Sequence, residues 1–253
     1  AKERLETGRI YTMFVDHANE HGSWLDQVDT SNLCLEVNHP LIPIEDVNDP
    51  KGEIGVCILA AVNWLEIKDE DEMKNVCDVI VRMLDASAEM AKERGSCEKF
   101  DRTKFSQGIL PIDTYKKDVD EFITEPLHMD WEGLRAKIKQ YGMRHSTLTA
   151  CMPVESSSVI QSSTNGIEPP RSLISYKGSK ANILPVVVPG IDKYSDNYTF
   201  AFDMPDNSGY LKVAAAIQKF TDMSISTNTY YIPSRYPQNK VPVQDVIKDI
   251  LYL

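Results

Sequence analysis

The segment Asn32–Glu36 places a thiol between an amide and a carboxylate. Apolar and polar residues alternate from Asn32 to Val37, and this period of two predicts a β-strand. Such a strand would carry Asn32, Cys34 and Glu36 on one face and bury Leu33, Leu35 and Val37 on the other. The polar row suits thiol chemistry assisted by a carboxylate. The alternative is an edge strand with one solvated face and an incidental cysteine.

Two further segments carry groups that could take part in catalysis or binding. Cys57 lies in Glu53–Leu59, which is apolar on both faces and predicts a buried strand. The thiol there could also be a small core residue. Pro153–Ser158 is rich in serine and predicts a loop that leads into a helix, where free N–H groups and hydroxyls suit a phosphate. An ordinary N-cap is the alternative.

Helix signals surround these segments. Asp69–Arg94 has early acidic residues, apolar residues at helical spacing and Gly95 at its end. Asp130 and Gly142 bracket a helix over Trp131–Tyr141. Further elements are expected as strands over Arg9–Phe14, Thr147–Met152 and Ile183–Val188, and as helices over Tyr210–Met223 and from Pro242 onward, with a buried stripe at Val243, Val246, Ile247, Ile250 and Leu251. The alternation favours an α/β architecture, with a barrel as one form.

Composition narrows the classes of partner. The 253 residues carry 27 Lys and Arg against 38 Asp and Glu, a net charge of −11, which argues against nucleic acid. No apolar stretch is long enough to span a membrane, and no signal peptide is visible. The odd count of five cysteines favours a reducing cytoplasm over a disulfide scaffold. His17 and His21 could share a helix face, but no nearby ligand completes a zinc pattern, so no metal site is expected.

Several segments, in order along the chain, resemble the large catalytic subunit of class I ribonucleoside-diphosphate reductases from bacteria and phages. Asn32–Glu36 is similar to the finger-loop motif of that family, and Gly52–Cys57 is similar to its strand with a redox cysteine. The other matching segments are Gly108–Asp118, Pro153–Ser157, Thr164–Arg171 and Pro233–Pro237. The resemblance covers nearly the whole chain.

The resemblance implies part of a ten-stranded α/β barrel, made of two half-barrels around a central finger loop. Cys34 would become a thiyl radical that abstracts the 3′-hydrogen of the ribose, with Glu36 as general base on the 3′-hydroxyl. Asn32 would hydrogen-bond the substrate hydroxyls. Cys57 would be one of two thiols that end as a disulfide. The substrate diphosphate would be held by the segment Pro153, Val154, Glu155, Ser156 and Ser157.

The same resemblance implies partners. No cofactor is expected in this chain: the radical would come from a small metal-containing subunit, and thioredoxin or glutaredoxin would supply reducing equivalents. The substrate would be a ribonucleoside diphosphate, and the assembly a homo-oligomer completed by the remainder of the large subunit.

Parts of the family pattern are not found in the sequence. The amino-terminal cone, the specificity region, the first redox cysteine, the radical-transfer tyrosines and the carboxy-terminal tail have no counterpart. Val81–Ala86 and Ser87–Cys97 resemble places far apart in the family, so a gap or deletion is expected near residues 85–87.

Two other functions stay open at this stage. A reductase-derived module without catalysis could serve assembly or regulation. A cysteine hydrolase could use Cys34 with a histidine base, although no histidine lies near in sequence and Glu36 is a poor activator of a thiol.

Overall fold

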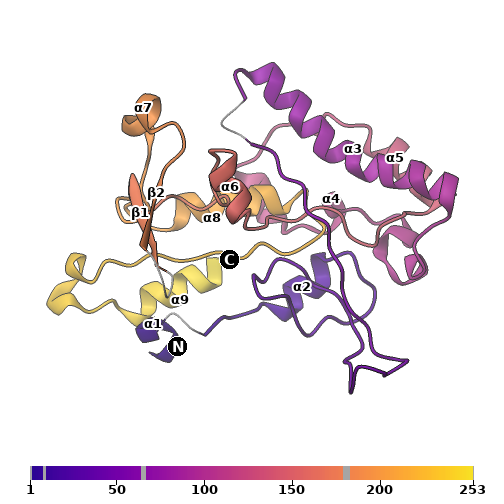
Figure 1. The fold of residues 1–253 in the computed structure, drawn as a ribbon, viewed down its shortest axis with the longest axis horizontal. Helices are drawn as coiled ribbons and strands as arrows, with labels where there is room; N and C mark the ends of the chain where they lie inside the picture. Colours follow the sequence, from indigo (N-terminus) through magenta and orange to yellow (C-terminus); the bar gives the residue numbers. More distant parts are fainter. Residues whose placement is uncertain (1, 8–9, 64–66, 179–182, 253) are drawn as a thin grey trace.

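The computed structural model describes residues 2–7, 10–63, 67–178 and 183–252. Helices dominate these residues, and long extended segments connect them (Figure 1). The α-helices are α1 (Lys2–Thr7), α2 (Val15–His21), α3 (Glu70–Arg94), α4 (Pro111–Thr114), α5 (Trp131–Tyr141), α6 (Ser156–Ile160), α7 (Ile191–Tyr194), α8 (Ser208–Gln218) and α9 (Val243–Tyr252). Short 3-10 helices cover Phe100–Arg102, Lys104–Gln107, Lys117–Glu121, Ser195–Asn197, Pro233–Arg235 and Pro237–Asn239.

The core lies where α3 and α5 pack side by side (Figure 1). Local signals set the limits of both helices. The Asp69 carboxylate accepts a hydrogen bond from the N–H of Glu72, and the Asp130 carboxylate accepts one from Gly133. Gly95 and Gly142 follow the last turns with positive φ, which glycine adopts without strain. The buried cluster contains Leu84, Ala88, Phe105, Leu110, Ile112, Trp131, Leu134, Ile138 and Met143. The helix predictions at residues 69–94 and 131–141 are confirmed.

Helix α3 is continuous across the expected join at residues 85–87, and its carboxyl half is built into the core. Ser87 is buried, and its hydroxyl lies 3.0 Å from Nδ1 of His145. Lys137 of α5 forms ion pairs with Asp85 and Glu89. The predicted apolar positions Met73, Val76, Val79 and Ile80 have side chains outside the described residues.

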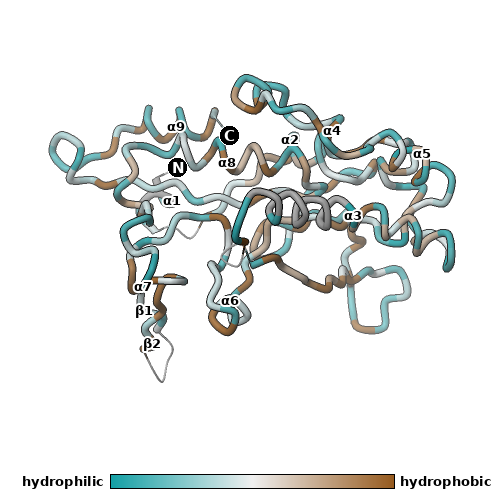
Figure 2. The backbone as a smooth tube through the Cα atoms, turned by 90° about the horizontal axis from the view of Figure 1, so that it is seen from above, coloured by the Kyte–Doolittle hydropathy of each residue, from teal (hydrophilic) through white to brown (hydrophobic). Residues whose placement is uncertain are grey.

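The strands β1 (Ile174–Gly178) and β2 (Ile183–Val187) form an antiparallel hairpin, with Ile174 opposite Val187. Figure 2 shows this hairpin projecting from the body of the chain. The predicted strand at Ile183–Val188 is therefore confirmed as β2. In the part of the chain that the structure describes, this hairpin is the only regular sheet. The described residues therefore combine α-helices with a partial β-sheet, and a ten-stranded barrel is not seen among them.

Three predicted strands are wrong. Residues 10–14 and 32–37 belong to no described strand, and Arg9 lies outside the described residues. Glu53–Leu59 runs extended but is not buried: the side chains of Ile54, Val56 and Ile58 are 75%, 81% and 97% exposed. An apolar strand is buried only when neighbouring strands cover it. Among the described residues no strand pairs with this segment.

Two further predictions need correction. The predicted strand Thr147–Met152 is reduced to a single bridge, which joins Cys151 to Ile225 in parallel. The stripe on α9 is mostly uncovered: Val246 is buried, while Val243, Ile247 and Leu251 are exposed, because the described elements cover little of this helix. No helix in the described ranges is long and apolar enough to span a membrane.

Candidate active site

The segment 31–38 is a tight loop rather than a strand, and Asn32 closes it. The Nδ2 group of Asn32 donates to Oε1 of Glu36 at 2.7 Å, and its Oδ1 accepts from the N–H groups of Glu36 and Val37, each at 3.1 Å. The Asn32 N–H also donates to the Val37 carbonyl. Leu35 turns the chain with a φ of 65°. The amide and the carboxylate therefore meet through a turn, not through the pleat of a strand.

The turn reverses the expected burial of its side chains. Leu33, predicted to lie in a core, is 88% exposed, whereas Glu36 is 5% exposed. The Oε2 atom of Glu36 is buried and has no hydrogen-bond partner. A buried carboxylate oxygen without a donor is costly, so this atom is poised for a hydroxyl or another donor.

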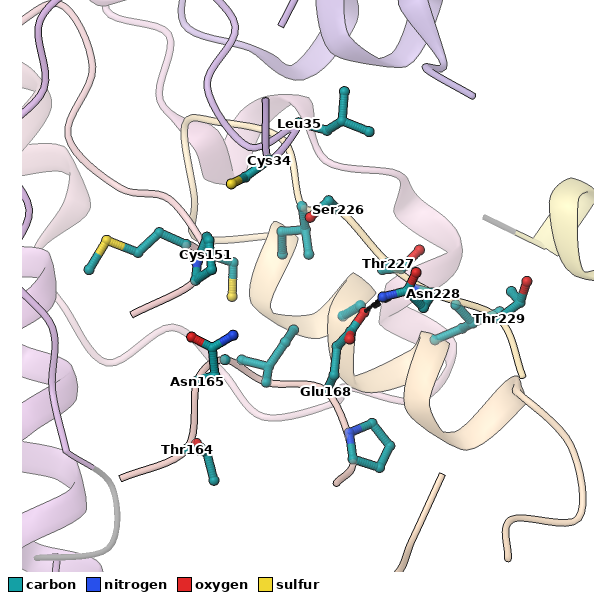
Figure 3. Close-up of a pocket in the computed structure, with 18 of the residues that line it drawn as sticks. Cys34, Leu35, Cys151, Thr164, Asn165, Glu168, Ser226, Thr227, Asn228 and Thr229 are labelled. Atoms are coloured by element: carbon teal, nitrogen blue, oxygen red, sulfur yellow. Dashed lines mark hydrogen bonds between the residues drawn. The ribbon is translucent and has the colours of Figure 1, made fainter. Parts of the chain in front are cut away.

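The Cys34 thiol faces a large open pocket of about 2070 Å³. Figure 3 shows Cys34, Cys151, Asn165 and Glu168 among the residues that line this pocket. Burial, and then the charges of Glu36 and Glu155, raise the pKa of Cys34. A raised pKa keeps the group as a thiol at neutral pH. The S–H bond is therefore available, and the nucleophilic thiolate is disfavoured.

The phosphate-loop segment, residues 153–158, reaches the same pocket. Helix α6 begins at Ser156, as predicted, and Glu155 precedes it with a φ of 49°. Asn165 holds the segment: its carbonyl accepts from the Val154 N–H at 2.8 Å, and its side chain accepts from the Glu155 N–H at 2.5 Å. The Ser157 N–H also donates to the Val154 carbonyl at 3.2 Å, so these three N–H groups of the segment are engaged within the chain. The segment remains polar and exposed at Ser156 and Ser157.

The structure places some of the predicted site residues on one pocket. Cys34, Pro153, Glu155 and Ser158 line the pocket, and Asn32 and Glu36 belong to the Cys34 loop without lining it. Val154, Ser156 and Ser157 belong to the phosphate-loop segment without lining the pocket. Cys57 is exposed on the extended segment 53–59 and does not line the pocket.

Two pocket residues were missed by the sequence reasoning. Lys177 on β1 forms an ion pair with Glu155 at 3.4 Å, which places a cation beside the phosphate-loop segment. Glu168 accepts hydrogen bonds from the backbone and the side chain of Asn228 (Figure 3). Glu168 lies within the Thr164–Arg171 motif, which was the available signal. Nothing in the sequence around Lys177 indicated that this residue lies beside the phosphate-loop segment.

Three of the five histidine rings form hydrogen bonds within the chain: His21 bonds Thr221 and Thr114, His39 bonds Thr147, and His145 bonds Ser87. His17, which stacks on Phe14, and His21 line the same pocket as Cys34. The raised pKa of Cys34 argues against a cysteine hydrolase, because that enzyme needs a thiolate nucleophile. Within the described ranges, no three His, Cys, Asp or Glu side chains gather as a metal site.

Sequence comparison assigns the family. The family model described as "Ribonucleotide reductase, barrel domain" matches residues 1–89 and 84–253. Together these stretches cover the chain, which therefore belongs to the ribonucleotide reductase barrel-domain family. The resemblance in the sequence motifs is confirmed, and the family membership supports a barrel-derived α/β fold.

Curated relatives carry the name ribonucleoside-diphosphate reductase subunit alpha. The chain is 40% identical to the protein of Buchnera aphidicola subsp. Baizongia pistaciae, 41% to that of Escherichia coli (named reductase 1 subunit alpha) and 33% to that of enterobacteria phage T4. Each comparison covers 99% of this chain and 42% of the relative, so the chain spans less than half the length of these proteins. The first two alignments extend over 316 positions, more than the 253 residues of the chain.

Proposed function

We propose that this chain supplies the radical-cysteine and phosphate-binding parts of a ribonucleoside-diphosphate reductase large subunit. The reaction is the reduction of a ribonucleoside diphosphate to the 2′-deoxy form. The observation that carries the proposal is the closed loop around Cys34, in which the Asn32 amide holds the buried Glu36 carboxylate at 2.7 Å. The Cys34 thiol and part of the phosphate-loop segment line one pocket, and the Glu36 carboxylate, with its unpartnered oxygen, lies in the same loop as Cys34.

The proposed roles are those that the family resemblance implies, and the contacts of the Cys34 loop support them. Cys34, as a thiyl radical, takes the 3′-hydrogen atom to become a thiol, and it returns this hydrogen atom to C3′ at the end of the reaction, which regenerates the radical. The unpartnered Oε2 of Glu36 accepts the proton of the 3′-hydroxyl, and the 2′-hydroxyl leaves as water with a proton from one of the two redox thiols. Asn32 orients the carboxylate and offers polar atoms to the substrate hydroxyls. The raised pKa of Cys34 supports this assignment, because hydrogen-atom transfer needs the S–H form.

Two thiols supply the electrons that reduce C2′ and are oxidised to a disulfide. Cys57 is one of them, and the second comes from the remainder of the large subunit. Thioredoxin or glutaredoxin then reduces the disulfide, and a small metal-containing subunit generates the radical. In this structure Cys57 is exposed and does not line the pocket, so the role proposed for it depends on the remainder of the large subunit.

The phosphate-loop segment holds the diphosphate. Within the segment Pro153, Val154, Glu155, Ser156 and Ser157, the exposed hydroxyls of Ser156 and Ser157 at the start of α6 are available to a phosphate. Lys177 adds a positive charge. The ion pair between Lys177 and Glu155 is exposed, so a phosphate can replace the carboxylate as the partner of the lysine.

The domain organisation is part of the proposal. We assign residues 1–253 to a portion of a ten-stranded barrel that is completed by other polypeptide, in a homo-oligomer. Support for a deletion near residues 85–87 comes from the two family matches, which meet at residues 84–89, and from alignments longer than the chain. The four described cysteines are free, which suits a reducing cytoplasm.

The test is complementation. The chain is mixed with the amino-terminal and carboxy-terminal portions of the Escherichia coli alpha subunit, the small subunit and thioredoxin, and deoxynucleoside diphosphate is measured. We expect no product from the chain alone and product from the mixture. Cys34→Ser should abolish product. Cys97→Ser is the matched control, since Cys97 is another free thiol and does not line the pocket.

Two outcomes would reject this function. Equal turnover by wild type and Cys34→Ser would refute the radical assignment. A complex that assembles but gives no product would favour the alternative of a non-catalytic assembly or regulatory module.

A further inference from the structure

Residues 222–228, called the floor segment here, run beneath the two loops of the candidate site. The segment follows α8, which ends at Gln218 rather than at the predicted Met223. The Gln218 side chain donates to the hydroxyl of Thr221 at 2.9 Å and to the Met223 carbonyl at 2.7 Å, so it ties the chain as it leaves the helix. Residues Ser224–Asn228 then line the pocket.

Asp222 joins the floor segment to the chain that leads into the phosphate-loop segment. Its carboxylate accepts from the N–H groups of Leu148 and Thr149, each at 2.8 Å, and from the Thr149 hydroxyl at 3.1 Å. The Asp222 N–H donates back to the same hydroxyl at 2.9 Å. Asp222 is 1% exposed and Thr149 is 5% exposed. The bridge from Cys151 to Ile225 continues this contact toward Pro153.

Asn38 joins the same segment to the Cys34 loop. Its Nδ2 group donates to the hydroxyl of Ser224, and its N–H lies 3.4 Å from the sulfur of Met223. Asn38 is 1% exposed. The Cys34 loop and the phosphate-loop segment are therefore anchored within three consecutive residues, Asp222 to Ser224.

We propose that Asp222 is a positioning residue that sets the register between the Cys34 loop and the phosphate-loop segment through the floor segment. This inference rests on the proposed function for its catalytic meaning. A substrate held by its diphosphate at one loop must present its ribose to Cys34 at the other. An error of about 1 Å in that register costs about a hundredfold in rate.

A carboxylate is suited to this position because three donors converge on it. An ionised aspartate has two acceptor oxygens and no donor. In Asp222→Asn, the carboxamide presents one oxygen and one NH₂ group, so either rotamer turns an N–H toward a backbone N–H. One buried donor, on Leu148 or Thr149, then loses its partner.

Hydrogen–deuterium exchange on the chain itself tests the structural part. In Asp222→Asn we expect amides in residues 148–158 and in residues 31–38 to exchange about tenfold faster, with α5 unchanged. Ser224→Ala is the matched control, and it should loosen only residues 31–38. Acceleration confined to Leu148 and Thr149 would overturn the inference. Equal acceleration in α5 would also overturn it, since that result means global destabilisation.

The complemented enzyme tests the catalytic part. With the diphosphate still bound but the ribose out of register, Asp222→Asn should lower kcat by about tenfold or more and change KM by less than about threefold. An unchanged kcat would refute positioning. If wild-type enzyme gives no product, the proposed function fails, but the exchange experiment still decides whether the floor segment couples the two loops.

Discussion

Asp222 should make the stability of this protein depend on pH in the direction opposite to that of its carboxylates with lowered pKa values, such as Asp113 and Asp120. Burial raises the pKa of Asp222 from an ordinary value of 3.8 to about 6, against the lowering effect of the Thr149 and Leu148 N–H groups. The folded protein therefore binds this proton more tightly than the unfolded chain does. The contribution of Asp222 to stability is fully present below pH 3.8 and is lost as the pH rises through 6.

The magnitude follows from the shift in pKa. A difference of roughly two units corresponds to about 3 kcal/mol at neutral pH. The same linkage predicts that about 1 kcal/mol of this loss occurs between about pH 5 and pH 7. Carboxylates with lowered pKa values, such as Asp113 beside Arg135, change stability with pH in the opposite sense. A measurement on the wild type alone would therefore not reveal the contribution of Asp222.

Comparison of wild type with Asp222→Asn isolates the effect, because the other groups cancel. Urea unfolding can be followed by the fluorescence of the buried Trp24 and Trp131. The free-energy difference between the two proteins should move by about 1 kcal/mol in favour of the variant from pH 5 to pH 7. Thr149→Val keeps the carboxylate but removes a hydroxyl donor that lowers the pKa of Asp222, so its pH dependence should lie at higher pH than that of the wild type. A difference that does not vary with pH would refute the reasoning.

Three other predictions concern the core and the site. Leu84→Ala should lower the free energy of unfolding, measured in urea, by about 2–5 kcal/mol, because the side chain of Leu84 on α3 is 1% exposed in the core. A loss of less than about 1 kcal/mol would contradict this packing. Asp130→Ala should cost about 1 kcal/mol through loss of the N-cap of α5, and Asp130→Asn should restore most of it. Cys34 should react with iodoacetamide more slowly at neutral pH than a free cysteine, and mass spectrometry of its peptide would show this; thiolate-like reactivity would exclude the raised pKa.

The helices were predictable because their signals are local. Asp69, Asp130, Gly95 and Gly142 act on hydrogen bonds within four residues of themselves, and the structure has each in the expected place. Apart from Ile183–Val188, which contains β2, the predicted strands did not form as expected, because a strand forms only against a partner. The period of two in Asn32–Val37 is real, but the Asn32 side chain converts it into a closed turn. Glu53–Leu59 reads as buried, yet no described strand covers it.

The candidate site divides in the same way. The residue types of Asn32, Cys34 and Glu36, and the serine-rich start of α6, could be read from the sequence and are sufficient to indicate the family. Their shared pocket depends on contacts between distant positions: Asp222 with Thr149, Asn38 with Ser224 and Glu168 with Asn228. These pairs are separated by 73, 186 and 60 residues.

The sequence alone determined which groups are available for chemistry and where the capped helices begin and end, since both depend on neighbouring residues. Only the tertiary structure decided that Glu36 is buried with one oxygen free and that Leu33 faces solvent. Only it placed both loops on one floor segment. Burial and long-range hydrogen bonds depend on which segments, distant in sequence, come into contact in the fold. Local periodicity does not determine those contacts.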